Sequence, residues 1–139
     1  MKYTSLHFTT FLILTSCIFT HTTIDASLIT WYNNYQQKTI KVGQASWYSE
    51  TDPGINIHTA NMEVFDDSGL TAAMWDVPFH QRIKVTNFEN GKSVVVRVND
   101  RGPHRRFVER GRIIDLSKQA FLEIAPLKEG LINIQLELL

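Results

Sequence analysis

The chain has 139 residues, which is long enough for one hydrophobic core and too short for two ordinary domains. Hydrophobic residues make up 43% of it, and the 14 basic residues equal the 14 acidic ones, so no overall positive charge favours nucleic acid as a partner. The single cysteine, Cys17, excludes an intrachain disulfide framework and a cysteine-based zinc site. We expect a leader followed by one monomeric domain without a cofactor or a metal ion.

The first residues have the layout of an export signal. Lys2 precedes a largely apolar run that ends at Leu14 and is shorter than the roughly 20 residues of a membrane-spanning helix. Leu14-Thr15-Ser16-Cys17 resembles a bacterial lipobox, in which the signal is cut before the cysteine and the cysteine is acylated. We therefore expect a lipoprotein signal peptide at residues 1–16 and a membrane anchor at Cys17; the alternative is a plain signal peptide cut after Ala26. Both place the mature protein in the cell envelope facing the periplasm, and Ile18, where an aspartate could stand, favours the outer membrane.

Residues 17–41 are predicted to be a linker, because they are rich in Thr, Asn and Gln and keep no period of 2 or 3.6. From residue 42 onward the pattern changes to short β-type runs separated by turn residues. The first predicted strands are Val42–Tyr48, Arg82–Asn87 and Ser93–Asn99. Between the last two, the Asn90-Gly91 pair tolerates a positive φ and predicts a tight β-hairpin.

The last third of the chain predicts a strand, a helix and a strand. Arg112–Asp115 is a short β-type run, and apolar residues recurring every four positions predict a helix over Ser117–Ala125 that Pro126 ends. In the closing strand, Leu131–Leu138, apolar and polar residues alternate, so one face is buried. Six or so short strands around one small helix favour a compact closed barrel over residues 42–139.

Several motifs occur in order through residues 42–139. They are Gly43-Gln-Ala-Ser-Trp-Tyr48, Thr59-Ala-Asn61, Glu63-Val-Phe-Asp66, Leu70-Thr-Ala-Ala73, Val94-Val-Val-Arg-Val-Asn-Asp-Arg-Gly-Pro103 and Gly111-Arg-Ile-Ile-Asp-Leu-Ser117. In these the chain resembles the rare lipoprotein A family. The resemblance implies an all-β fold, a six-stranded double-psi β-barrel with one short helix. It also implies an endolytic lytic transglycosylase that cleaves peptidoglycan glycan strands denuded of stem peptides and leaves 1,6-anhydro-muramyl ends.

A lytic transglycosylase needs a proton donor for the leaving oxygen, and the same group can later act as the base. The motif segments offer four acids as catalytic candidates: Glu63, Asp66, Asp100 and Asp115. Asp100 directly follows a predicted strand, and an approach by Arg101 would lower its pKa and suit a stabilising anion. Asp115 has apolar neighbours whose burial would raise its pKa toward that of a donor.

Each acid also has a structural interpretation. Asp115 could cap the helix that begins near Ser117, and Asp100 could hold the turn before Gly102-Pro103. Apart from the resemblance, Glu63 and Asp66 are solvated loop acids.

Three further residues are candidates for contacts with glycan. Trp47 and Tyr48 have flat apolar faces for sugar rings, and Arg101 is a donor beside the predicted site; the alternative for both aromatic residues is a place in the core. Arg101 also begins an arginine-rich stretch that reaches Arg112, which is either solvated or binds anionic polymer.

The chain departs from the family pattern at three positions. Met74 stands where the resemblance implies a histidine, and a thioether cannot carry a proton. Met62 and His80 stand where it implies glycines, so two turns that need a positive φ carry side chains. The first departure keeps open a non-catalytic, expansin-like glycan-binding module. A separate alternative is a hydrolase of the related endoglucanase type, which needs a second carboxylate to activate water.

Overall fold

The structure is a computed structural model that describes residues 25–27 and 40–139. The predicted signal peptide, its anchor residue Cys17 and nearly all of the predicted linker lie outside the described residues. Within the described ranges, no helix has both the length and the apolar character needed to cross a bilayer. The chain from Lys38 to Leu139 forms one unit, and it contains the candidate site.

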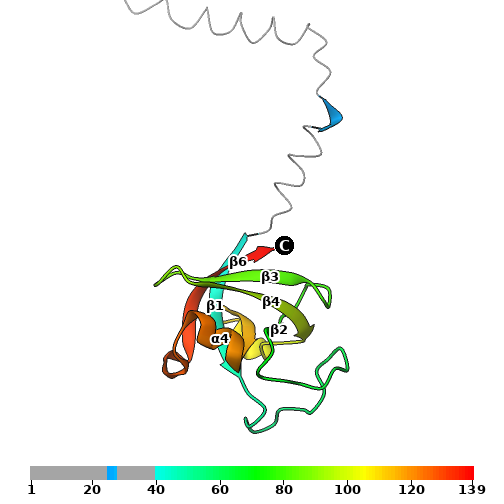
Figure 1. Ribbon diagram of the computed structural model, residues 1–139, viewed down its shortest axis with the longest axis vertical. Coiled ribbons are helices and arrows are strands. Elements are labelled where there is room, and N and C mark those ends of the chain that lie inside the picture. The colour runs from blue at the N-terminus through cyan, green and yellow to red at the C-terminus, as the bar shows by residue number, and fades with distance from the viewer. Residues whose placement is uncertain (1–24, 28–39) are drawn as a thin grey trace, which may run out of the picture. The chain divides into compact units, whose positions relative to one another are not determined.

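Six strands close into a barrel in the order β1-β5-β2-β4-β3-β6 (Figure 1). Two neighbouring pairs, β1 with β5 and β2 with β4, are parallel, and the other four are antiparallel. The predicted all-β closed barrel is therefore confirmed. The strands are β1 (Ile40–Tyr48), β2 (Thr71–Ala73), β3 (Arg82–Asn87), β4 (Ser93–Asp100), β5 (Arg112–Ser117) and β6 (Leu131–Leu138).

The main helix is α4 (Lys118–Ile124), which packs against β1, β4 and β5. It begins at Ser117, whose hydroxyl accepts a hydrogen bond from the Ala120 amide at 3.3 Å, so the alternative in which Asp115 caps this helix is wrong. At its other end, the side-chain amides of Asn87 and Asn90 both donate to the Ile124 carbonyl, at 3.0 and 2.9 Å. The β3–β4 hairpin thus satisfies a helix-terminal acceptor.

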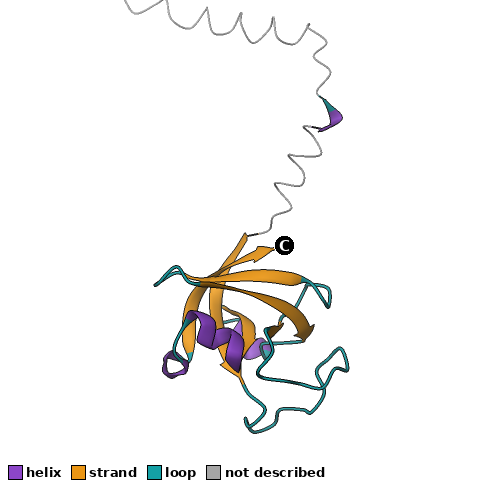
Figure 2. Cartoon of the chain, viewed as in Figure 1, coloured by secondary structure: helices purple, strands orange, loops and turns teal. Residues whose placement is uncertain are grey.

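Two further helical segments were not predicted. They are the four-residue α3 (Arg105–Val108) and the three-residue 3-10 turn η1 (Leu127–Glu129). His104 caps α3, because its Nδ1 accepts from the Arg106 amide at 3.3 Å. Both segments are short beside the strands, so they leave the fold class unchanged (Figure 2).

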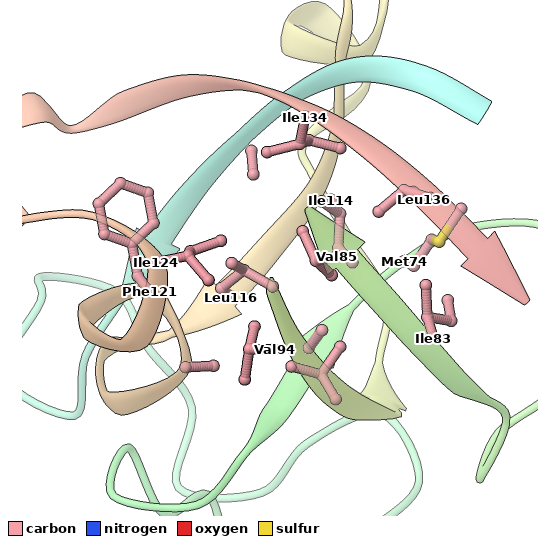
Figure 3. Packing of buried hydrophobic residues seen from close by; sticks show 14 of the residues in the cluster. Met74, Ile83, Val85, Val94, Ile114, Leu116, Phe121, Ile124, Ile134 and Leu136 are labelled. Atoms are coloured by element: carbon pink, nitrogen blue, oxygen red, sulfur yellow. The ribbon is translucent and has the colours of Figure 1, made fainter. Parts of the chain in front are cut away.

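The core is built from alternating strand residues. Burial alternates along β3, along β4 up to Val98 and along β6 up to Leu136, as the predicted period of 2 requires. Phe121 and Ile124 of α4 pack into the same cluster, and Met74, which follows β2, joins it (Figure 3). Each buried Ile, Leu or Val side chain contributes about 1.5–3 kcal/mol, so this cluster holds the barrel rigidly beneath the loops.

Candidate active site

The loop between β1 and β2 leaves the barrel and folds back on itself. Residues 57–65 form a small hairpin, in which His58 and Val64 are bridge partners and the Phe65 amide donates to the Ile57 carbonyl at 2.8 Å. Its turn is attached to the end of β4, because the Asn61 amide donates to the Asn99 carbonyl at 3.2 Å. We call this segment the 57–65 hairpin; it forms one side of the candidate site.

Glu63 attaches the hairpin to the barrel. Its two carboxylate oxygens accept from Nη1 and Nη2 of Arg97 on β4, both at 2.8 Å. The side-chain amides of Asn61 and Asn99 donate to the same carboxylate at 2.9 and 3.2 Å. The guanidinium first, and then these amides, lower the pKa of Glu63 to about 2. Glu63 is therefore an ionised residue engaged in a bidentate pair.

Asp100, the last residue of β4, is held by backbone amides. Its Oδ1 accepts from the Ala60 amide of the hairpin at 2.9 Å and from the Arg101 amide at 2.7 Å. The Arg101 guanidinium has other contacts, since Nη1 donates to the Met74 carbonyl at 2.9 Å and the group stacks over Phe79 at 3.7 Å from the ring centroid. Arg101 thus approaches Asp100 through the backbone amide of Arg101, while its guanidinium binds the Met74 carbonyl. The alternative in which Asp100 holds the turn before Gly102-Pro103 stays a prediction, because the bond shown runs from the next residue, Arg101.

Asp115 lies across β2 from Asp100. The two residues are register partners of the same residue, Ala73, on its opposite sides. The Asp115 side chain is 14% exposed, and Arg112 donates to its Oδ1. Burial raises the pKa of Asp115, a rise that Arg112 opposes and the charge of Asp100 supports. Ala73 thus lies between Asp115, whose pKa is raised by burial, and Asp100, which accepts hydrogen bonds from two backbone amides.

Tyr48 completes this group. Its ring stacks on Phe65 of the hairpin with centroids 4.5 Å apart and an interplanar angle of 8°. Its hydroxyl is buried and has no hydrogen-bond partner within the described residues. Burial first, and then the charges of Asp100 and Asp115, raise the pKa of the phenol. Tyr48 therefore stays protonated between the hairpin and the two carboxyl groups.

A hollow of about 350 Å³ opens above these residues, between the hairpin and the end of β4. We call it the carboxylate hollow. Its size is within the range of small-molecule sites. It is lined by Tyr48, Gly54, Ile55, Asn56, His58, Thr59, Ala60, Phe65, Asp100 and Arg101.

Four of the predicted site residues do not line this hollow: Trp47, Glu63, Asp66 and Asp115. The Trp47 indole packs against the core and donates to the Leu127 carbonyl at 3.1 Å. Asp66 is exposed, and its Oδ1 accepts from the amide and hydroxyl of Ser68, which is a turn-forming arrangement. Of the predicted group, Tyr48, Asp100 and Arg101 line the hollow, and Asp115 lies across β2 from Asp100. Glu63 is farther away and is connected to the end of β4 through Asn99.

Sequence reasoning missed Arg97, the partner of Glu63. The signal was available, because Arg97 is the one charged residue among the valines of Val94–Val98. However, an arginine on the polar face of a strand is expected to be exposed to solvent. Its partner, Glu63, comes close only when the 57–65 hairpin folds against the barrel. In the described part of the chain, no group of three His, Cys, Asp or Glu side chains is arranged to hold a metal ion.

Comparison with known proteins agrees with this geometry. A family model described as lytic transglycolase matches residues 40–136. The chain is 48% identical over 102 residues to the probable endolytic peptidoglycan transglycosylase RlpA of Synechocystis sp., and 45% identical over 98 residues to the endolytic peptidoglycan transglycosylase RlpA of Vibrio cholerae. These alignments cover 73% and 70% of this chain.

The chain belongs to the rare lipoprotein A family. Its alignments cover 30% and 35% of these two relatives, so it spans about a third of their length. Among solved structures, a Streptomyces papain inhibitor is similar with a TM-score of 0.56 and 25% identity, over 73% of this chain and 94% of that one. An expansin of Clavibacter michiganensis is similar in fold, with a TM-score of 0.55 and 20% identity, over 73% of this chain and 50% of that one. The predicted double-psi β-barrel is confirmed, and the breadth of proteins with this fold means that function must be argued from the site.

For a rare lipoprotein A domain, the three departures now have structural descriptions. Met62 and His80 keep the positive φ, at 71° and 69°, so both turns retain the glycine-like backbone with larger side chains. Met74 is 2% exposed and lies in the hydrophobic core. A side chain in this position is covered by apolar neighbours.

Proposed function

We propose that this domain is a peptidoglycan lytic transglycosylase that cleaves denuded glycan strands and leaves 1,6-anhydro-muramyl ends. The observation that carries the proposal is the position of Asp115, whose pKa burial raises, one strand away from Asp100, which lines the carboxylate hollow. Membership of a family whose relatives are named as endolytic peptidoglycan transglycosylases supports it.

In the proposed reaction Asp115 is the general acid. Its carboxyl proton passes to the glycosidic oxygen as the bond from that oxygen to the anomeric carbon breaks. The 6-hydroxyl of the same muramyl residue then attacks the anomeric carbon and returns its proton to the Asp115 carboxylate. Bonds and protons balance without water, and the enzyme is restored.

The other members of the group stabilise and position. The Asp100 carboxylate, fixed by the Ala60 and Arg101 amides, faces the positive charge that develops on the sugar ring. Tyr48 lines the hollow beside Asp100, and the Glu63–Arg97 pair holds the hairpin that carries Ala60. Glu63 is thus a positioning residue, because its lowered pKa is unsuited to donating a proton near neutrality.

A second candidate function is a binding module that holds glycan without cleaving it. The observation that favours it is Met74, a buried thioether where the family resemblance implies an imidazole. In the proposed transglycosylase reaction no proton passes through position 74, so we expect turnover with methionine there.

Product analysis separates the candidates. The purified chain is incubated with denuded glycan strands, and the soluble products are identified by mass spectrometry. Anhydro-muramyl ends are the expected result; reducing ends would assign a hydrolase, and retention of intact strands would assign the binding module. A Met74→His variant measured in parallel tests whether the methionine limits the rate.

We further propose that the protein is tethered in the cell envelope by acylation of Cys17, facing the periplasm and favouring the outer membrane. The lipobox-like Leu14-Thr15-Ser16-Cys17 supports this location. Metabolic labelling with a fatty-acid analogue should mark the wild-type chain and leave Cys17→Ala unlabelled. Equal labelling of both chains, or of neither, would contradict the lipid anchor.

A further inference from the structure

A second hollow adjoins the carboxylate hollow. It measures about 260 Å³ and is lined by Glu50, Ile55, Asn56, Ile57, Val64 and Phe65. Three of these residues, Ile55, Asn56 and Phe65, also line the carboxylate hollow, so the two are neighbouring parts of one depression. We call the second one the apolar hollow.

Its walls expose hydrophobic side chains that the fold does not need. Ile57 is 75% exposed, Val64 66% and Ile55 37%. Isolated exposed apolar residues are ordinary on protein surfaces, but three around one hollow indicate a contact site. The His58–Val64 bridge and the Phe65 to Ile57 hydrogen bond fix two of these walls, so they are a preformed surface.

The polar residues of the apolar hollow restrict what can occupy it. The exposed Asn56 offers an amide that can both donate and accept a hydrogen bond. Glu50 places a carboxylate on the rim, which repels other carboxylates such as the lactyl group of a muramyl residue. An uncharged group with a methyl end and an amide matches this combination of walls.

We propose that the apolar hollow is a subsite for the acetamido group of an N-acetylglucosamine residue, next to the sugar held in the carboxylate hollow. The inference rests on the proposed function for the identity of the polymer. The acetamido methyl packs against Val64 and Ile57, and its amide pairs with Asn56. The site then distinguishes N-acetylated glycan from a plain glucan, which has neither group.

The test compares two hexasaccharide probes, one of β-1,4-linked N-acetylglucosamine and one of β-1,4-linked glucose. Calorimetric titration of the full chain should show tighter binding of the N-acetylated probe by about tenfold. Val64→Ser and Ile57→Ser should each weaken binding of that probe by roughly 3- to 10-fold and leave binding of the glucose probe unchanged. Val42→Ser is the matched control, because Val42 on β1 is also 66% exposed and lies outside both hollows.

Equal affinity for the two probes, no binding of the N-acetylated probe, or equal losses in Val64→Ser and Val42→Ser would overturn the subsite. Unchanged melting temperatures exclude misfolding, since the substituted side chains are exposed. Cleavage of denuded glycan is scored separately. Anhydro ends without a preference for the N-acetylated probe would support the transglycosylase and contradict the subsite. A preference for the N-acetylated probe without anhydro ends would support the subsite and contradict the transglycosylase.

Discussion

Glu63 and Asp115 are carboxyl groups of similar intrinsic acidity, and their surroundings shift their pKa values in opposite directions. Glu63 accepts four hydrogen bonds from an arginine and two amides, which lower its pKa. Asp115 is mostly buried, and the loss of hydration raises its pKa despite Arg112. The contacts of single residues therefore determine in which direction the pKa of each acid shifts.

The Glu63 contacts predict an acid-sensitive contribution to stability. The pKa of Glu63 falls from its usual 4.5 to about 2 on folding, so its stabilisation is complete above pH 4.5 and is lost as the pH falls toward 2. With 36% of the side chain exposed, solvent screening limits it to about 1 kcal/mol. Glu63→Gln should therefore lose less stability than the wild type between pH 5 and pH 2 in thermal unfolding. Glu89→Gln, a change at an exposed turn, is the control, and parallel curves for wild type and Glu63→Gln would refute the assignment.

Met62 predicts a stabilising substitution. Its φ of 71° is unfavourable for a residue with a Cβ, and its side chain is 76% exposed, so little packing is lost when it is removed. Met62→Gly should raise the free energy of unfolding by roughly 0.5–1 kcal/mol, measured by urea denaturation. Met62→Ala removes the same side chain and keeps the Cβ, so it should give no comparable gain. A gain of equal size in both variants would place the effect in the side chain.

Among the elements, α4 and β2 are connected through Ser117. Its buried hydroxyl donates to the Gly69 carbonyl at 2.5 Å and accepts from the amides of Ala120 and Thr71 at 3.3 and 3.4 Å. One side chain thus caps the helix and holds both Gly69 and Thr71 at the start of β2. The position of β2 matters for the site, because its Ala73 lies between Asp100 and Asp115.

Ser117→Ala should consequently cost about 2 kcal/mol, since it removes an N-cap and leaves buried partners unsatisfied. Chemical denaturation measures the loss, and Ser93→Ala, at an exposed strand start, serves as the control. A cost below about 0.5 kcal/mol would mean that water replaces the hydroxyl at this cap.

The sequence predicted elements whose pattern is local. The alternating strands β3 and β6 have the predicted bounds, and α4 begins after Ser117 as its apolar spacing and terminating proline indicate. β2 was missed because its three residues are all buried, show no alternation, and pair only with strands distant in sequence. α3 was missed because a segment of four residues is too short to show a helical periodicity.

At the scale of the whole molecule, the barrel topology assembles the site. Asp100 and Asp115 come from different strands, and the insertion of β2 between β4 and β5 places them on the two sides of Ala73. The family resemblance predicted both residues as candidates. The contacts that surround each of them could not be predicted, because they form only when the 57–65 hairpin folds against the barrel. The Glu63–Arg97 pair joins residues 34 positions apart, and no periodicity could have indicated it.

The most direct test of the central claim is the pH dependence of anhydro-muramyl product formation by the full chain and its Asp115→Asn and Asp100→Asn variants. If Asp115 donates the proton, the wild-type rate falls as the pH rises through its elevated pKa. Asp115→Asn should lose about 100- to 10,000-fold in rate together with this alkaline limb, and Asp100→Asn should lose rate while keeping the limb. An Asp115→Asn protein that folds normally and retains the wild-type rate and profile would contradict the account.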